Sequence, residues 1–318
     1  MGAGDSGFRI QARVNILFAA TTEKAEFWFP RLQPLLPQDR LFAWPDNNGG
    51  DIDVAVVATH PRGALAGLPK LRLIQSLWMG VDNIVKDPDL PAGVPVARLI
   101  DPGMVAAMGE TAIAYVLDWH RHFWCYRKFQ QQKLWKRRRQ YLASDRTIGI
   151  LGLGELGSTV AAKLHAMGFH VAGWSRRPKS LDGVYCSTDI DEVLQRSDAV
   201  ICLLPLTPHT RGILNKDRLQ KIRKDGCVIN LARGGHLVIS DLLAALDSGH
   251  LAQAYLDVFE TEPLPADSTL WGHPGVTVTP HIAALTEPRT SVGKVAENIE
   301  RLRRGERPNN LVDFDAGY

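Results

Sequence analysis

Short apolar runs alternate with mixed, partly amphipathic stretches along the first hundred residues of this chain. The apolar runs have the length of strands, which are expected at residues 14–20, 41–44, 54–58, 71–77 and 96–99. Residues 23–36 are amphipathic and end at Pro37, so they are expected to form a helix. Repeated alternation of this kind favours a small parallel sheet covered by helices.

The same alternation resumes after residue 145. Strands are expected at 148–151, 169–174, 199–204, 227–231, 253–258 and 276–279, and helices at 158–168, 190–196, 216–222 and 240–248. Residues 198–204 are almost wholly apolar, which is typical of a strand buried on both faces. A long helix over 103–126 is a candidate crossover between two domains, and a helix over 288–304 is expected to pack back on the first domain. Residues 130–145, which follow the long helix, are polar and irregular.

A glycine-rich loop follows the strand at 148–151 and precedes the helix at 158–168. Gly152 permits a tight turn, Gly154 lets the backbone approach a pyrophosphate, and Gly157 allows the helix to pack closely on the sheet. A glycine turn without a ligand is the alternative, but the strand and helix on either side favour a dinucleotide site. The loop residues expected to contact the dinucleotide are Gly152, Gly154, Glu155, Leu156 and Gly157.

The second strand of this domain ends in a basic segment. An Asp or Glu at this position accepts from the adenosine ribose and repels a 2′-phosphate, which favours NAD. Here Trp174 is followed by Ser175, Arg176 and Arg177, with Lys179 two residues beyond. Because arginine forms a fork of hydrogen bonds with a phosphate, the segment predicts NADPH or NADP, with NADH or NAD as the alternative cofactor. A solvated basic turn is the other interpretation.

The glycine loop lies near the middle of the chain, so the other domain must come from the first hundred residues and the last helix. The predicted fold class is α/β, with two doubly wound parallel-sheet domains: a Rossmann cofactor domain inserted in a flavodoxin-like substrate domain. The expected boundaries are 103–287 for the dinucleotide-binding domain, and 1–102 with 288–318 for the substrate domain.

Composition and charge remove several classes of function. The chain has 318 residues, enough for two cores, and is 45% hydrophobic and 22% charged, as in ordinary globular proteins. A formal charge of +3 does not indicate nucleic acid, and no apolar run reaches the length of a membrane span. Cys125, Cys186, Cys202 and Cys227 lie far apart, which predicts neither a metal site nor a disulfide framework. Met1 to Ser6 lacks an export pattern and reads as a tail, so a cytoplasmic protein is expected.

Polar segments follow three successive strands of the second domain. They are Asn230–Gly235, Asp257–Leu264 and Thr279–Ala284. In a doubly wound sheet, ligands gather at the carboxyl ends of the strands. All three segments are therefore expected near the nicotinamide end of the cofactor cleft.

Together with the glycine loop, these segments resemble the D-isomer-specific 2-hydroxyacid dehydrogenases. The resemblance covers nearly the whole chain, beginning at the loop Leu77–Asp82, and is nearest to a branch of the family, the bacterial NADPH-dependent glyoxylate/hydroxypyruvate reductases of the A type. The motifs that carry it are Asp101-Pro102-Gly103-Met104, Trp174-Ser175-Arg176, Leu231-Ala232-Arg233-Gly234 and the Gly317-Tyr318 terminus. The resemblance implies a homodimer that reduces a small 2-oxo acid, glyoxylate or hydroxypyruvate, to glycolate or D-glycerate.

This reduction needs a hydride, a proton for the carbonyl oxygen and a cation that holds the substrate. The resemblance assigns His281 as the proton donor, which suits histidine because it titrates near neutral pH. Glu262 would hydrogen-bond the other ring nitrogen and favour the imidazolium, and Arg233 would bind the substrate in a planar fork. Taken singly, His281 could be a satisfied loop residue, Glu262 a turn cap and Arg233 the partner of a surface acid.

Other positions follow from the resemblance. The amides of Met79 and Gly80, beside Trp78, would receive the substrate carboxylate, although Trp78 and Met79 are bulkier than the small residues usual in this loop. Trp135 resembles an aromatic residue that family dimers lend to the neighbouring active site; a partly buried anchor is the alternative. Asp257 could accept from the nicotinamide amide or cap its strand. The remaining positions implied to contact the cofactor are Leu204, Pro205, Leu231, Ala232 and Ala283.

The sequence leaves three other functions to consider. A related reductase could act on a larger 2-oxo acid such as phenylpyruvate or 2-oxogluconate, because substrate choice lies in side chains that a sequence does not position. A non-catalytic, dinucleotide-sensing corepressor also uses this fold, but its long disordered extensions are not visible here. The basic run Lys136–Arg139 could be a nucleic-acid patch, although one such run without a recognition motif favours a solvated loop.

Overall fold

The computed structural model of the chain describes residues 13–314, so the Met1–Ser6 tail and the Gly317-Tyr318 terminus lie outside the described residues. The described chain divides into two compact units. The first unit contains the residues up to Met104 and those from Thr286 onward, and the second runs from Val105 to Leu285. The predicted boundaries of the functional domains, after residues 102 and 287, remain a prediction.

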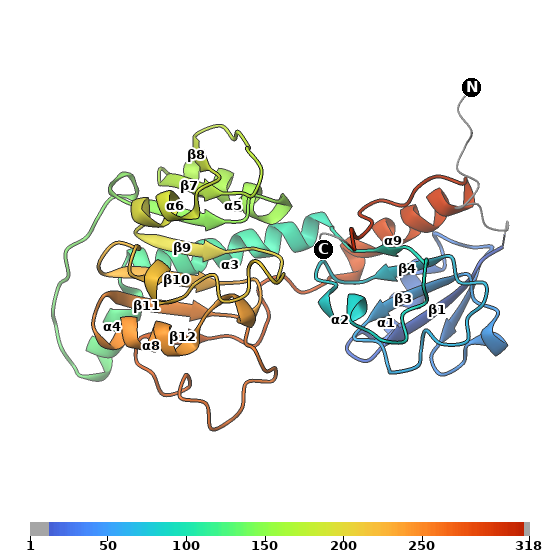
Figure 1. Ribbon diagram of the computed structural model, residues 1–318. Helices are drawn as coiled ribbons and strands as arrows, with labels where there is room; N and C mark the ends of the chain where they lie inside the picture. Colours follow the sequence, from blue (N-terminus) through green and yellow to red (C-terminus); the bar gives the residue numbers. More distant parts are fainter. Residues whose placement is uncertain (1–12, 315–318) are drawn as a thin grey trace. The chain divides into compact units, whose positions relative to one another are not determined.

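The first unit is built on a five-stranded parallel sheet (Figure 1). Its order is β2–β1–β3–β4–β5, and the strands are β1 Asn15–Ala20, β2 Arg40–Ala43, β3 Val54–Ala58, β4 Leu73–Ser76 and β5 Val96–Ala97. This is the flavodoxin-like strand order. Every residue of β3 is buried, which explains why its sequence is apolar throughout. The helices are α1 Ala25–Leu32, α2 Asp82–Val85 and α9 Pro288–Arg303, with a short 3₁₀ turn at Asn48–Gly50.

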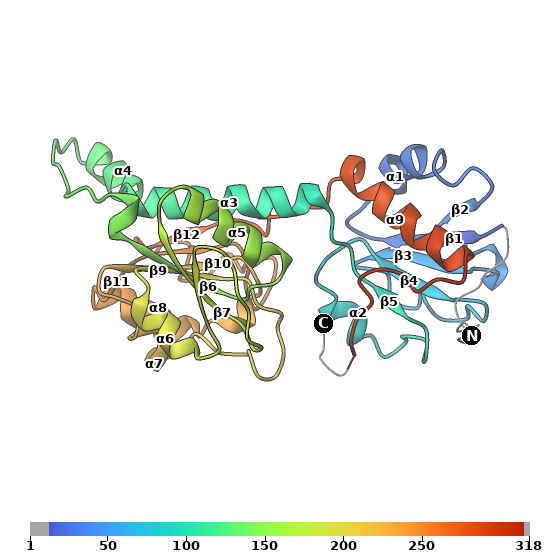
Figure 2. The same ribbon diagram turned by 90° about the horizontal axis from the view of Figure 1, so that it is seen from above.

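Helix α9 joins the end of the chain to its beginning within this unit. It packs against α1, as the red and blue helices of Figure 2 show. Arg303 Nη2 donates to the fully buried carboxylate of Asp39 at 2.6 Å, and Asn298 Nδ2 donates to Gln75 Oε1 of β4 at 2.7 Å. The predicted packing of the last helix on the first domain is therefore confirmed.

The second unit contains a seven-stranded parallel sheet. Its order is β12–β11–β10–β9–β6–β7–β8 (Figure 1), and its strands are β6 Thr147–Leu151, β7 His170–Trp174, β8 Val184–Ser187, β9 Ala199–Cys202, β10 Gly226–Asn230, β11 Leu251–Leu256 and β12 Val276–Val278. Counted from β6, this is the Rossmann order extended by one strand. The predicted α/β class with two doubly wound parallel sheets is confirmed.

The sequence failed to predict β8. This strand lies at the edge of the sheet and pairs only with β7. Its four residues are half-buried or exposed, and its apolar run, Val184 to Cys186, is too short to mark a strand. Its pairing with β7, a tertiary contact, is what makes it a strand.

The helix expected over 103–126 is two helices, and that prediction was wrong. Helix α3 spans Pro102–His120 and α4 spans Phe123–Gln131, and they are separated by His122, whose φ is 59°. A left-handed histidine is uncommon, and here its Nε2 contacts the carbonyl oxygen of Arg139 at 3.1 Å. No glycine or proline marks the break, so the pattern of the sequence does not reveal it. Helix α3, the long helix of Figure 2, still runs from one unit into the other along the chain.

The remaining elements of the second unit cover the sheet. They are the helices α5 Glu155–Ala166, α6 Ile190–Arg196, α7 Lys216–Leu219 and α8 Ile239–Asp247, with 3₁₀ turns at Ala143–Asp145 and Gly234–His236. Cys202 and Cys227 are fully buried in this sheet, and burial raises the pKa of the Cys202 thiol to about 12. They are core residues, as predicted. Among the described residues, no helix is long and apolar enough to cross a membrane.

Candidate active site

The glycine loop joins β6 to α5. Gly152 has a φ of 103°, which an L-residue rarely adopts, so glycine is required for the turn. A Cβ on Gly157 would lie 1.8 Å from the carbonyl oxygen of Gly152, so this position must also be glycine. The helix begins at Glu155, three residues earlier than predicted, because Gly157 is part of its first turn.

The mouth of the loop is open. A Cβ on Gly154 would meet no atom within 4 Å, and no side chain caps the helix that follows. The amides of the first turn therefore point to a space that the protein does not fill. A cavity of about 480 Å³ adjoins this turn, and its lining includes Gly154, Glu155, Ser158, Lys163 and Lys179. Helix amides beside a cavity with two lysines suit an anionic group.

The basic segment follows β7. Trp174 is half-buried and its Nε1 donates to the carbonyl oxygen of Thr188 at 3.0 Å. Ser175 Oγ donates to the carbonyl oxygen of Arg177 at 2.8 Å, which shapes the turn, and Arg176 and Arg177 are exposed. These contacts leave the segment at the carboxyl end of β7, next to the glycine loop after β6.

Lys179 connects the basic segment to the glycine loop. Its ammonium donates to the carbonyl oxygen of Leu153 and to Ser158 Oγ, the latter at 3.2 Å. The sequence predicts Lys179 near the phosphate site but not among the cofactor contacts. Its lysine charge was the only available signal, because its contact with the loop depends on the tertiary fold.

The residues after β9 and β10 form a second side of the site. Leu204, Leu231 and Ala232 are buried, so their side chains belong to the hydrophobic core. The carbonyl oxygen of Pro205 accepts from Thr210 Oγ1 at 2.7 Å and lies 3.2 Å from His236 Nε2. These contacts order the loop that is predicted to run along the cofactor.

Arg233 lies three residues after the last residue of β10, Asn230. The side-chain amide of Asn230 donates to the carbonyl oxygen of Arg233 at 2.9 Å, and the guanidinium of Arg233 donates to the carbonyl oxygen of Ala232 at 2.7 Å. A Cβ on Gly234 would lie 1.9 Å from the carbonyl carbon of Phe259, so only glycine permits this packing. The close approach places the Arg233 segment against the segment that contains Glu262.

His281 and Glu262 form a hydrogen-bonded pair. His281 Nδ1 lies 2.8 Å from Glu262 Oε2, and the two side chains are 49% and 36% exposed. Glu262 Oε1 accepts from the amide of Phe259 at 2.9 Å, so the alternative role of Glu262 as a turn cap is also realised. Burial by itself would raise the pKa of Glu262, but the hydrogen bonds from His281 and Phe259 and the charges of His281 and Arg233 outweigh it and lower the pKa. The structure therefore brings together the three residues predicted to be catalytic.

Asp257 directly follows β11 and is fully buried. Its Oδ1 accepts from Thr279 Oγ1 at 2.6 Å and from the amide of Ile282 at 2.9 Å, and its Oδ2 accepts from the amide of Ala283 at 2.9 Å. The alternative in which Asp257 caps the strand end is thus what the structure shows. Contact with a nicotinamide amide, for Asp257 or Ala283, remains a prediction.

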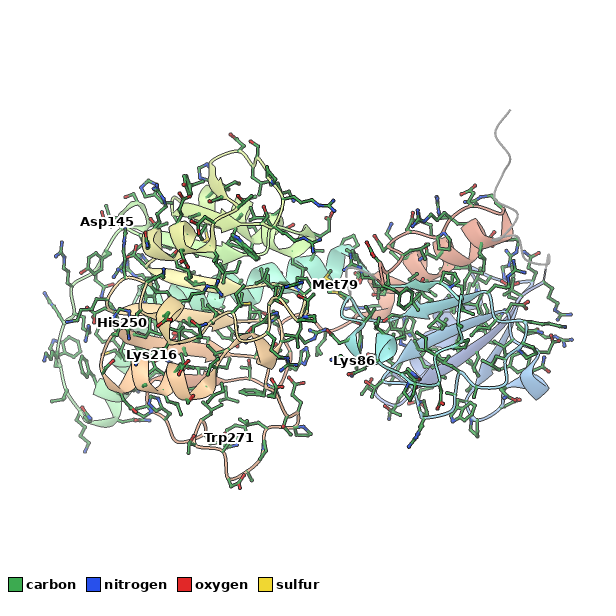
Figure 3. The ribbon with its side chains drawn as sticks, in the orientation of Figure 1. Met79, Lys86, Asp145, Lys216, His250 and Trp271 are labelled. Atoms are coloured by element: carbon green, nitrogen blue, oxygen red, sulfur yellow. The ribbon has the colours of Figure 1, made fainter. Side chains whose placement is uncertain are left out.

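The predicted substrate loop belongs to the first unit, directly after β4. Ser76 Oγ and the backbone of Trp78 hydrogen-bond each other at 3.0 Å, and the carbonyl oxygen of Trp78 accepts from the amide of Leu99. Met79, labelled in Figure 3, and Gly80 are half-buried. Within residues 13–314 no acceptor contacts the amides of Met79 and Gly80, which is compatible with the predicted binding of a carboxylate.

Trp135 lies in the polar loop after α4 and is 96% exposed. Its alternative interpretation as a partly buried anchor was therefore wrong. Lys136 to Arg139 are likewise exposed, and Arg138 donates its amide to the hydroxyl of Tyr126. This basic run is therefore part of a solvated loop. No group of three or more metal-ligating side chains occurs within the described part of the chain.

The two parallel sheets and the open glycine loop define a dinucleotide-binding protein of the α/β class. The family model of the D-isomer specific 2-hydroxyacid dehydrogenase NAD binding domain matches residues 113–283. The chain belongs to the D-isomer-specific 2-hydroxyacid dehydrogenase family, as its motifs predicted.

Relatives support this assignment over nearly the full length. The chain is 44% identical over 313 residues to "Glyoxylate/hydroxypyruvate reductase A" of Serratia proteamaculans, covering 96% of this chain and 100% of that protein. A solved structure from Xanthobacter autotrophicus Py2, a family member in complex with NADPH and MES, has a TM-score of 0.92, 38% identity and coverage of 96% and 100%. An NADPH-dependent glyoxylate/hydroxypyruvate reductase from Sinorhizobium meliloti, in complex with NADP and sulfate, has a TM-score of 0.89, 36% identity and the same coverage.

Proposed function

We propose that this protein is an NADPH-dependent reductase of small 2-oxo acids, which converts glyoxylate to glycolate and hydroxypyruvate to D-glycerate. The observation that carries the proposal is the His281–Glu262 contact of 2.8 Å beside Arg233, at the carboxyl edge of the dinucleotide-binding sheet. The names of the relatives from Serratia proteamaculans and Sinorhizobium meliloti support the same substrates and cofactor.

The residues present fit NADPH. The uncapped first turn of α5 and the open space at Gly154 suit the pyrophosphate, and Arg176 with Arg177 suits the 2′-phosphate. Two further segments, after β9 and after β10, would flank the nicotinamide half. NADH remains the weaker alternative cofactor in this proposal. When bound, the reduced nicotinamide supplies the hydride.

The protein's own residues supply the rest of the chemistry. Glu262 holds Nδ1 of His281, so Nε2 is the ring nitrogen that would donate a proton to the carbonyl oxygen of the substrate. Arg233 would bind the substrate carboxylate and polarise its carbonyl group. The amides of Met79 and Gly80, in the first unit, would bind a carboxylate.

The proposal includes a cytoplasmic homodimer that binds neither nucleic acid nor membrane. The four cysteines are free, which suits a reducing compartment. The almost complete exposure of the Trp135 side chain suits a residue that reaches a second protomer.

A steady-state panel tests the function. The purified protein would be assayed with NADPH and NADH against glyoxylate, hydroxypyruvate, phenylpyruvate and 2-oxogluconate. We expect the highest kcat/KM for glyoxylate or hydroxypyruvate with NADPH. A preference for the larger acids would contradict the substrate assignment. Tight NADPH binding without oxidation of NADPH by any substrate would instead favour a non-catalytic dinucleotide sensor.

A further inference from the structure

One face of α3 is hydrogen-bonded to both ends of the loop that carries His281. The hydroxyl of Tyr115 lies 2.8 Å from Thr279 Oγ1, and Thr111 Oγ1 donates to the carbonyl oxygen of Ala283 at 3.1 Å. Residues four apart in a helix lie on the same face, so Thr111 and Tyr115 act side by side. The segment Thr279–Ala283 between their partners has His281 at its centre.

The chemistry of the groups sets the direction of these hydrogen bonds. Thr279 Oγ1 donates its one proton to the carboxylate of Asp257 at 2.6 Å, so the hydroxyl of Tyr115 must donate to Thr279. Burial raises the pKa of Tyr115; the Thr279 contact lowers it, but the charge of Asp257 raises it again, and the net shift is upward. The phenol therefore keeps its proton and remains a donor.

Asp257 transmits this contact to His281. Its carboxylate accepts the amides of Ile282 and Ala283, and its carbonyl oxygen accepts the amide of His281 at 2.8 Å. His281 has a φ of 54°, a conformation that is unfavourable for a residue with a Cβ and that persists only when its surroundings hold it. The loop thus depends on its hydrogen bonds for the backbone geometry that aims the imidazole.

We propose that Tyr115 and Thr111 are positioning residues for His281: the two hydroxyls clamp its loop to α3 and hold the imidazole in the orientation that proton donation requires. The proposal rests on the proposed function, because only a proton-donating His281 needs this orientation. Neither hydroxyl touches the substrate in this scheme. Tyr115 acts through Thr279 and Asp257, and Thr111 acts through the backbone of Ala283.

Tyr255 provides a matched control. The ring of Tyr115 stacks on the ring of Tyr255, with centroids 4.8 Å apart and planes inclined by 20°. The hydroxyl of Tyr255 is also buried in the second unit, but it donates to Asp118 at 2.5 Å and takes no part in the clamp. Tyr255→Phe therefore removes a buried phenol hydroxyl from the same stack and leaves the His281 loop bonded to α3.

The test compares Tyr115→Phe, Thr111→Val and Tyr255→Phe with the wild type, all as the full chain. Hydrogen–deuterium exchange of the peptide that contains Ile282 and Ala283 reports the order of the loop without any turnover. In Tyr115→Phe and Thr111→Val we expect faster exchange and a kcat for glyoxylate lower by roughly 3–10-fold, with the KM for NADPH nearly unchanged. In Tyr255→Phe we expect exchange and kcat to match the wild type.

A double-variant comparison separates positioning from a general loss of structure. If Tyr115 acts through His281, adding Tyr115→Phe to His281→Ala should reduce the residual turnover no further. Unchanged exchange in Tyr115→Phe would overturn the clamp, and faster exchange with unchanged kcat would overturn its role in positioning. If the wild type did not oxidise NADPH, the proposed function would fail, while the exchange comparison would still decide whether α3 orders the loop.

Discussion

His281 owes its place to contacts of two kinds. Its ring is held by Glu262, and its backbone is held by Asp257 in a left-handed conformation. The sequence predicted the first contact through the resemblance to a family. The second contact had no signal in the sequence, because a positive φ at a histidine depends on the atoms around it and not on the residue itself.

His281→Ala should reduce kcat by roughly 10²–10⁴ with glyoxylate, because the carbonyl oxygen loses its proton donor. NADPH binding should stay close to the wild-type value, as measured by nucleotide fluorescence. His170→Ala is the control, since this exposed histidine begins β7 and so lies at the amino end of its strand, away from the residues that follow the carboxyl ends. Near-normal turnover of the His281 variant would remove His281 from the mechanism.

The pairing of Glu262 should affect stability with a definite dependence on pH. Its pKa is lowered in the folded protein, so the carboxylate contributes stability above the usual range of a glutamate and loses it as the pH falls through the lowered value. Glu262→Gln should therefore lower Tm near neutral pH, and the difference from the wild type should shrink in acid. A difference that grows in acid would contradict the direction of the shift.

Arg176→Ala should weaken NADPH binding by about 10-fold or more and leave NADH almost unaffected, because only NADPH carries a phosphate for the guanidinium to bind. The measurement is the ratio of kcat/KM with the two cofactors. Arg196→Ala removes another exposed arginine of the second unit and should not change this ratio. Equal losses for both cofactors in the Arg176 variant would refute the NADPH assignment.

Among the strands and helices, the pattern of apolar positions predicted correctly those elements whose apolar residues are buried. Strand β3 is buried on both faces and its predicted limits were correct. Strand β8 and the break at His122 were missed because an edge strand needs a partner and a left-handed turn needs a tertiary contact. Periodicity reports how a residue is buried, and it cannot report pairings between distant segments.

Two glycine variants test the glycine loop as an element. Gly157→Ala should lower the free energy of unfolding by about 1–3 kcal/mol, because its Cβ would lie 1.8 Å from the carbonyl oxygen of Gly152. Gly154→Ala should leave Tm unchanged, because its Cβ meets no protein atom, yet it should weaken NADPH binding by occupying the mouth of the loop. Thermal unfolding and an NADPH titration measure the two effects. Equal behaviour of the two variants would contradict the geometry of the site.

At the scale of the whole molecule, one chain makes two compact units, and the first unit is completed by the last helix. The carboxylate of Asp39 links the two parts of the chain that form this unit. It accepts from the amide of Val14 before β1 and from Arg303 near the end of α9. Helix α3 carries the chain onward into the second unit. Stability of the first unit therefore depends on residues more than two hundred positions apart in the sequence.

Arg303→Met should destabilise the first unit by about 3–5 kcal/mol, because it leaves the fully buried Asp39 carboxylate without its cation. Calorimetry should show the transition of this unit at a lower temperature, while the transition of the second unit stays in place. The control is Arg304→Met, which breaks an exposed pair with Glu306 and should leave the stability of the first unit nearly unchanged. Similar losses of stability in the two variants would mean that the buried Asp39–Arg303 pair does not govern the stability of the first unit.

Consecutive residues predicted the two parallel sheets, the glycine loop and the basic segment after β7, and they marked Arg233, Glu262 and His281 as candidate catalytic residues. These features are local: apolar periodicity, glycine spacing and short motifs are written in consecutive residues. The tertiary structure decided the pairing of β8, the break at His122, the capping role of Asp257 and the hold of α3 on the His281 loop. Each of these depends on hydrogen bonds between residues that are not neighbours in the chain, and only the folded arrangement brings such groups within hydrogen-bonding distance.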